Sequence, residues 1–329
     1  MRQRRLVAAI AAAVLGVSAC GTGQGGGTAG SGYPRKPVTV TAPSEPGSGW
    51  DTTARALVQT LQKENLVDKP LPVQNRPGAT GAVWLSKMVT ANKGDPYQIA
   101  VTSTPIMSNS LRGLSKHSYQ DVTMIAKLFS EYYTIATTPD SKYKELPDLI
   151  NAIKKNPKSV PIGAAGDDRL PFSLVVMAAG GDPEKINFVN YEGGGEQTTA
   201  LLNGDIDAAI AGVSELRGQL VAKKLSGLGV LKEDRLEGDL ADIPTAKEQG
   251  YDVTLDNWRG VYGPPGMPKD AVKYWQDVLK KAMETKSWQK TAERNQWDTA
   301  YLQGKEMNDY LSTTNAELKK ALESTGDAK

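Results

Sequence analysis

The sequence has little of the chemistry that most catalytic and metal sites need. Its 329 residues contain one cysteine, Cys20, and one histidine, His117. One cysteine cannot form a disulfide within the chain, and a zinc site would lack its usual ligands. A Ser-His-Asp hydrolase would depend on His117, which lies in the polar stretch "GLSKHSYQD", and no G-x-S-x-G motif occurs. We interpret His117 as a solvated loop residue, while the many acidic residues leave a site for a hard cation open.

The chain also has no large excess of basic or acidic residues. The chain has 39 basic and 37 acidic residues, and without the three arginines of the opening "MRQRR" the balance is 36 to 37. No run of basic residues stands out. The sequence therefore gives no support for a nucleic-acid partner.

The N-terminus has the features of an export signal. The basic "MRQRR" precedes the apolar run "LVAAIAAAVLGVSA", which is short for a membrane span and ends in small residues before Cys20. This segment resembles a bacterial lipobox, which implies that residues 1–19 are a signal peptide and that Cys20 is lipidated. The alternative is an ordinary signal peptide with a chance cysteine. Residues 20–32 are rich in glycine and are expected to form a flexible tether below a globular body that begins near Tyr33.

Strand and helix patterns alternate along the body. Residues 38–42 alternate apolar and polar side chains, and apolar residues on one helical face follow within 51–64. Two further strand patterns, each with a helical one between, predict a parallel sheet covered by helices. Two strand patterns then stand back to back at 123–129 and 132–138, where we expect the chain to cross into a second lobe.

A second β/α series runs to about residue 231. An extended, Pro- and Gly-containing return segment follows, and two helical patterns at about 269–294 and 305–324 close the chain. The predicted fold class is therefore α/β with two lobes, joined by two hinge crossings. We expect residues 33–131 and 255–329 to form lobe 1 and residues 132–254 to form lobe 2. In such folds the ligand lies beyond the carboxyl ends of the strands, in a cleft that closes around it.

The first loop, "APSEPGSGWDTTAR", is suited to an anion. A Gly-rich loop that leads into a helix directs backbone N–H groups toward one point. A dinucleotide would need a third glycine where Thr52 stands, and the Gly-Lys-Ser/Thr of a P-loop is absent. A carboxylate needs only N–H donors and hydroxyls, which this loop supplies. Asp51 is either the helix N-cap, with Arg55 at ion-pair spacing, or an acceptor for a ligand group.

Seven segments in chain order resemble the substrate-binding proteins of tripartite tricarboxylate transporters. They span about residues 33 to 268. The segments are "SEPGSGWDTTAR", "QNRPGATGAV", "GDPYQIAV", "YQDVTMIAKL", "ELPDLINAIKKNPKSVPIGAAG", "NFVNYEGGGEQTTALLNGDIDAAIAG" and "DIPTAKEQGY".

This resemblance implies a type II periplasmic-binding fold without enzymatic activity, cofactor or metal. It implies capture of a small organic carboxylate, such as citrate or another di- or tricarboxylate. Delivery would be to a membrane permease with one large and one small subunit. With a lipidated Cys20, the protein is expected as a monomer on the outer face of the cytoplasmic membrane. A sensor that feeds a signalling partner is one alternative. An envelope enzyme that uses the carboxylates of Asp167 and Asp168 is another.

Carried over from the family's motifs, the expected ligand-binding residues lie in both lobes. Those of lobe 1 are Ser44, Gly47, Ser48, Asp51, Gly78, Ala79, Ser103 and Thr104. Those of lobe 2 are Gly163, Ala164, Ala165, Gly166, Asp167, Asp168, Arg169, Tyr191 and Asp207. Tyr191 could instead be a packing residue, Asp207 could pair within its lobe, and Arg169 could pair with Asp167 or Asp168 at the surface.

The sequence departs from the family's pattern at several of these positions. Ala164 replaces a serine, Asp168 and Arg169 replace Gly-Ser, and Glu192 replaces a lysine, while Glu45 adds a negative charge. The substrate could therefore differ from citrate, and an amino-bearing ligand or a cation-bridged carboxylate would suit the added acids better. Among the tryptophans, Trp258 is predicted to pack in the core or hinge.

Overall fold

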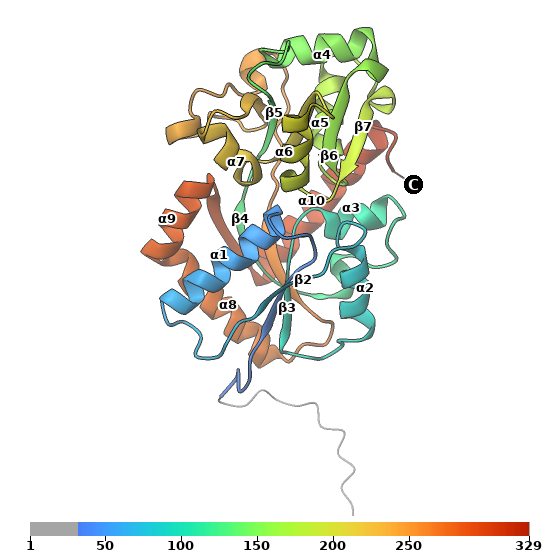
Figure 1. The fold of residues 1–329 in the computed structure, drawn as a ribbon. Coiled ribbons are helices and arrows are strands. Elements are labelled where there is room, and N and C mark those ends of the chain that lie inside the picture. The colour runs from blue at the N-terminus through green and yellow to red at the C-terminus, as the bar shows by residue number, and fades with distance from the viewer. Residues whose placement is uncertain (1–31, 329) are drawn as a thin grey trace, which may run out of the picture.

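The computed structural model describes residues 32–328, which form two sheets in two lobes (Figure 1). The first sheet has the strand order β11-β4-β10-β3-β1-β2 and the second β7-β6-β8-β5-β9. The strands of the first sheet are β1 (Thr39–Ala42), β2 (Val73–Asn75), β3 (Gln98–Thr102), β4 (Thr123–Ser130), β10 (Arg259–Gly263) and β11 (Asp298–Gln303). Those of the second are β5 (Tyr133–Thr137), β6 (Pro161–Ala165), β7 (Asn187–Tyr191), β8 (Ala208–Gly212) and β9 (Ser226–Val230).

Helices accompany both sheets. In the first lobe they are α1 (Gly49–Lys63), α2 (Ala82–Thr90), α3 (Pro105–Leu111), α8 (Lys269–Glu284), α9 (Lys286–Asn295) and α10 (Gly304–Ser324). In the second lobe they are α4 (Leu146–Lys155), α5 (Arg169–Ala178), α6 (Gly194–Asn203) and α7 (Val213–Val221). Short 3-10 turns occupy Tyr119–Asp121, Pro157–Ser159, Pro183–Lys185, Gly238–Leu240 and Lys247–Gln249.

The sheets are mixed, which differs from the expected parallel sheet. β1 pairs in parallel with β2 and β3, as the alternating patterns predicted. β10 is antiparallel to β3 and β4, and β11 is antiparallel to β4. These antiparallel strands come from the return segment and the C-terminal region. β11 was not expected from the sequence, because most of its residues are half-buried and its pairing with β4 is irregular.

The two crossings between the lobes lie side by side. β4 ends at Ser130 and β5 begins at Tyr133, so the first crossing has no helix, as expected from the back-to-back strand patterns. The second crossing leads into β10. The N–H of Asn257 donates to the carbonyl of Glu131 at 2.9 Å, which joins the two. All strands of the first sheet lie within 33–131 or 255–329 and all of the second within 132–254; the exact lobe boundaries remain our prediction.

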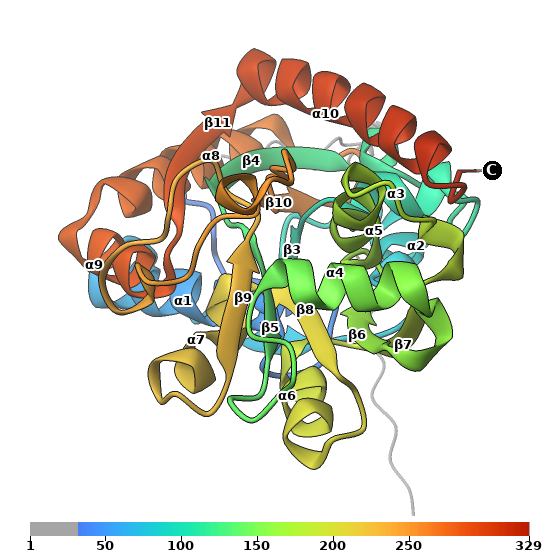
Figure 2. The same cartoon turned by 90° about the horizontal axis from the view of Figure 1, so that it is seen from above.

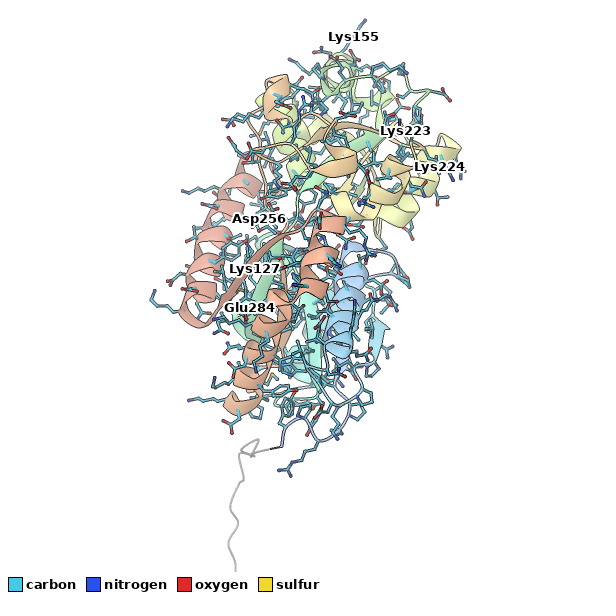
Figure 3. The ribbon with its side chains drawn as sticks, turned by 90° about the vertical axis from the view of Figure 1, so that its left-hand side faces the viewer. Lys127, Lys155, Lys223, Lys224, Asp256 and Glu284 are labelled. Carbon is cyan, nitrogen blue, oxygen red and sulfur yellow. The ribbon has the colours of Figure 1, made fainter. Side chains whose placement is uncertain are left out.

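A polar cluster with a buried lysine supports the crossings. The ammonium of Lys127, from β4, lies 3.0 Å from a carboxylate oxygen of Asp256, and Figure 3 labels both residues. The same ammonium lies 4.3 Å from the ring centre of Tyr310. Ser130 and Tyr310 also donate hydroxyl hydrogen bonds to Asp256. The cluster therefore connects β4, the return segment and α10.

Each lobe has its own hydrophobic core. Leu57, Trp275 and Trp288 are fully buried in the first lobe, and Ile162 and Phe172 in the second. Trp258 has no exposed surface and packs with residues of α10, which confirms its predicted packing role. Seen from above, α10 runs along one side of the molecule toward α3 and α5, and so contacts both lobes (Figure 2).

Candidate functional site

Figure 1 shows α1 of the first lobe below α6 and α7 of the second. Residues at the N-termini of these three helices line a cavity between the lobes. It holds about 570 Å³ of empty space, including open solvent at its mouth. Its lining combines hydroxyl, aromatic and charged side chains from both sheets. The lining residues are Pro43, Ser44, Ser48, Gly49, Trp50, Thr80, Ser103, Pro105, Tyr133, Ala165, Gly166, Asp167, Asp168, Tyr191, Glu192, Gly193, Glu215, Asn257 and Arg259.

The loop between β1 and α1 presents serine hydroxyls to this cavity. Ser48 is the N-cap of α1, and its Oγ accepts a hydrogen bond from the N–H of Asp51 at 3.4 Å. The Oγ atoms of Ser44 and Ser48 lie 2.5 Å apart. Trp50 donates from its Nε1 to Ser103 Oγ at 3.0 Å, which fixes the indole between the loop and the end of β3. The first lobe thus contributes hydroxyls and a helix N-terminus, both suited to a carboxylate.

Asp51 lies behind this loop. Its carboxylate accepts hydrogen bonds from the N–H of Gly47 at 2.9 Å, from Asn75 Nδ2 at 2.9 Å and from Arg55 Nε at 2.9 Å. Burial alone would raise the pKa of Asp51, but these hydrogen bonds outweigh it and lower that pKa. The N-cap interpretation of Asp51 was wrong, because Ser48 holds that position. Its role in the structure is to hold the loop in shape.

The β6–α5 loop carries two adjacent aspartates in different surroundings. Asp167 accepts hydrogen bonds from Ser108 Oγ at 2.5 Å and from Arg112 Nη1 at 2.8 Å. Both donors belong to the α3 region of lobe 1, so this carboxylate joins the lobes. Asp168 lines the cavity, and among residues 32–328 no hydrogen-bond donor contacts its carboxylate. Burial, together with the nearby carboxylates of Glu215 and Asp167, raises the pKa of Asp168 well above its ordinary value.

Glu215, in the first turn of α7, reaches the N-termini of two other helices. Its Oε2 accepts a hydrogen bond from the N–H of Gly194, the first residue of α6, at 2.8 Å. Its Oε1 lies so close to Gly49, the first residue of α1, that a Cβ there would fall 3.0 Å from it. Burial and the carboxylate of Glu131 raise the pKa of Glu215, although these N–H groups act against the rise.

A buried ion pair forms the floor of the cavity. Arg259, at the start of β10, lies 2.7 Å from Glu131 Oε2, and both side chains are almost completely buried. The other carboxylate oxygen of Glu131 accepts from the N–H of Ser214 at 2.8 Å. The pair therefore connects both crossings to the N-terminus of α7.

The structure places the expected site residues in two groups. Eight line the cavity: Ser44, Ser48, Ser103, Ala165, Gly166, Asp167, Asp168 and Tyr191. Nine do not: Gly47, Asp51, Gly78, Ala79, Thr104, Gly163, Ala164, Arg169 and Asp207. The position expected to be lipidated, Cys20, lies outside the described residues.

Three of the residues outside the lining have other contacts. Asp207 accepts from the hydroxyl of Tyr143 at 3.2 Å, within its own lobe. The guanidinium of Arg169 bonds Asn190 and lies over the ring of Phe188, rather than beside an aspartate. A Cβ on Gly163 would fall 2.5 Å from Ile206 Cδ1 and 3.3 Å from the Tyr191 ring, so glycine lets these side chains pack against the strand.

Sequence reasoning missed the charged residues Glu131, Glu215 and Arg259. Glu215 had a usable signal, because it follows the carboxyl end of β8 by three residues, where ligands of α/β folds bind. Glu131 and Arg259 lie far apart in the sequence. Only their pairing in space shows that they belong to the site.

Within residues 32–328, no three His, Cys, Asp or Glu side chains gather in a way that could hold a metal ion. In the same part of the chain, no helix combines the length and apolar character needed to cross a membrane.

Comparison with known proteins agrees with this geometry. Two lobes with a cleft at facing helix N-termini define a solute-binding protein of the periplasmic-binding fold. Residues 53–326 match the family described as "Tripartite tricarboxylate transporter family receptor". The chain belongs to this family, and the resemblance that the motifs indicated is confirmed.

One relative by sequence and two solved structures are also similar to this chain. A relative in Pseudomonas sp. (strain P51), "UPF0065 protein in tcbD-tcbE intergenic region", is 26% identical over 261 residues, or 76% of this chain and 75% of that protein. The solved structure of periplasmic binding protein BugD matches with a TM-score of 0.82 at 20% identity, covering 90% of this chain and 100% of that one. R. palustris Rpa4515, solved with adipate, also gives 0.82, at 19% identity, covering 90% and 99%. At these identities the two structures show the fold alone.

Proposed function

We propose that the protein is the solute-binding component of a tripartite tricarboxylate-type uptake system. It captures a small organic carboxylate outside the cytoplasm and delivers it to a permease with one large and one small membrane subunit. Lipidated Cys20 anchors it to the outer face of the membrane, and it acts as a monomer. Di- and tricarboxylates such as citrate are the first candidates because of the family's description, and adipate because a structural neighbour was solved with it.

The observation that carries this proposal is the cavity at the N-terminus of α1. The hydroxyls of Ser44 and Ser48 and the positive end of the helix face it, which suits a carboxylate. The loop of lobe 2 that contains Gly166 faces the same space, so a ligand there contacts both lobes. Closure about crossings near residues 130–132 and 253–259 would enclose it.

A thermal-shift screen of the purified protein tests this function. Ligands that bind only the folded state raise the melting temperature by mass action, so a carboxylate at about 100 times its Kd adds about 2.7 kcal/mol. The panel contains citrate, adipate and other di- and tricarboxylates, amino acids and uncharged sugars. We expect at least one carboxylate to stabilise the protein while the sugars do not. If no carboxylate-bearing compound shifts the melting temperature, the proposed function is wrong.

A further inference from the structure

The cavity carries more negative charge than its cations neutralise. Asp167, Asp168, Glu192 and Glu215 line it, against the single lining cation Arg259. Arg259 is paired with Glu131, and Asp167 is paired with Arg112. Within residues 32–328, no lysine or arginine lies at ion-pair distance from Asp168 or Glu215. Of the three lining carboxylates without a cationic partner among the described residues, Glu192 is exposed to solvent, whereas Asp168 and Glu215 are half-buried.

One of them occupies a position suited to a ligand carboxylate. Glu215 accepts the N–H of Gly194 at the start of α6 and lies against Gly49 at the start of α1. A Cβ on Gly194 would fall 2.7 Å from Glu215 Cβ, so glycine at this position admits the side chain. The anion-binding ends of two helices are therefore partly occupied by the protein's own carboxylate.

The remaining space has two unlike sides. The hydroxyls of Ser44, Ser48 and Ser103 lie on the lobe 1 side, where a ligand carboxylate can still bind. Asp168 and Glu215 lie on the lobe 2 side. A second carboxylate on the ligand would meet these two acids, whereas a protonated amine would pair with them.

We propose that the solute carries a protonated amine, bound by Asp168 and Glu215, and has zero or positive net charge. This inference rests on the proposed function and narrows its ligand class to amino-carboxylates, in preference to di- and tricarboxylates.

The charges around Asp168 support the binding of a protonated amine there. Burial is the main cause that raises the pKa of the Asp168 carboxyl, and Glu215, Asp167 and Glu131 raise it further, while Arg259 acts in the opposite direction. Tyr133 lines the same cavity. A bound cation favours the ionised carboxylate, so affinity for the amine falls as pH is lowered.

Ligands matched in length test the proposal. Succinate, 4-aminobutyrate and 1,4-diaminobutane share a four-carbon chain, and the five- and six-carbon series and the common amino acids extend the set. Calorimetry on the purified protein should give at least tenfold tighter binding for an amino-carboxylate than for its matched dicarboxylate, with affinity falling on acidification. Equal or tighter binding of the dicarboxylate overturns the inference and leaves the proposed function in place. Dicarboxylate binding that requires added calcium overturns it in favour of a cation bridge. If no carboxylate-bearing compound binds, the proposed function itself is wrong.

Isosteric variants test whether Asp168 and Glu215 bind the amine of the ligand. Asp168→Asn and Glu215→Gln each remove one negative charge at nearly constant shape, and each should weaken amino-carboxylate binding about tenfold without weakening dicarboxylate binding. Asp234→Asn removes the same charge from an exposed loop and should leave both affinities unchanged. If Glu215→Gln lowers the melting temperature strongly, Asp168→Asn decides alone, since no donor contacts its carboxylate. Unchanged amino-carboxylate affinity in Asp168→Asn overturns the assignment.

Discussion

Single residues in this protein divide between those that touch the cavity and those that hold its walls. Glu131 and Arg259 belong to the second kind, because their ion pair lies under the cavity with side chains 1% and 3% exposed. Their charges are removed from water, so each depends on the other for compensation. A buried pair of this kind is costly to break, whatever its net contribution to stability.

Glu131→Gln should therefore lower the free energy of unfolding by about 3 kcal/mol, since it leaves the Arg259 charge without its partner. Chemical denaturation measures the loss. The exposed pair Lys273–Asp277 on α8 gives the control, and Lys273→Ala should cost less than about 1 kcal/mol. Equal losses in the two variants would show that the buried pair is not a structural support.

Asp51→Asn should destabilise the first loop by about 1 to 2 kcal/mol at neutral pH, because the carboxylate accepts hydrogen bonds from three donors there. The pKa of Asp51 is lowered in the folded state, so the folded protein binds fewer protons at this site than the unfolded chain. The stabilisation is present above the unfolded-state pKa and is lost as pH falls through the folded-state pKa.

Denaturation curves of the wild type and Asp51→Asn at a series of pH values check this. The difference between them should shrink below about pH 4, the ordinary range of an aspartate. A difference that does not change with pH would assign the effect to the amide's shape rather than to the charge.

At the scale of elements, the loop that follows β6 and the loop that precedes α2 approach across the cleft. A Cβ on Gly166 would fall 2.5 Å from Thr80 Oγ1, closer than unbonded atoms come. Thr80 has a φ of 50°, in the left-handed region, so its backbone has little freedom to move away. Glycine at 166 thus permits the lobes to approach this closely.

Gly166→Ala should hold these loops apart and weaken ligand binding about tenfold while leaving the melting temperature of the free protein nearly unchanged. Thr80→Ala removes the clashing hydroxyl, so the double variant should recover most of the lost affinity. Calorimetry on both single variants and the double variant tests this. Failure of the double variant to recover would mean that the glycine acts through backbone freedom and not through space.

On the whole-molecule scale, several polar contacts join the lobes apart from the crossings, among them Lys232 with Asp298 and Gln296 with Glu237. Arg112 of lobe 1 and Asp167 of lobe 2 form one of them, with side chains 11% and 7% exposed. In the described structure the lobes are already in contact, so opening must break this pair. The crossings with their Lys127–Asp256 support would serve as the hinge.

Arg112→Gln should therefore shift the free protein toward an open state. Small-angle scattering should show a larger radius of gyration than in the wild type, and saturating ligand should restore the wild-type value. Lys305→Gln, which breaks an exposed pair within α10, is the matched control and should leave the radius unchanged. An unchanged radius in Arg112→Gln would mean that other contacts keep the lobes closed.

Cys20→Ser tests the proposed anchor. The variant should remain folded but either leave the membrane fraction or stay uncleaved, since serine cannot carry the lipid. Fractionation and the mass of the mature chain measure both. Normal, processed protein in the membrane fraction would contradict the proposed lipidation.

The sequence by itself determined much of this protein. Alternating patterns gave the elements of both lobes, because the side-chain period follows directly from strand and helix geometry. The back-to-back strand patterns at 123–138 located the first crossing, and seven ordered motifs identified the family. Serines and glycines of three of the motifs line the cavity, because loops at the ends of strands and helices converge there.

The tertiary structure alone decided the charge of the site. Glu131 and Arg259 are separated by more than a hundred residues in the sequence. They form an ion pair only because the two crossings lie side by side. Asp51 and Arg169 stand in site motifs but turn away, since Gly47, Asn75 and Arg55 satisfy the first and Asn190 and Phe188 hold the second. A motif specifies which residues a loop contains. Burial and the partners brought from other elements determine where each side chain points, and whether its charge is neutralised there or left for a ligand.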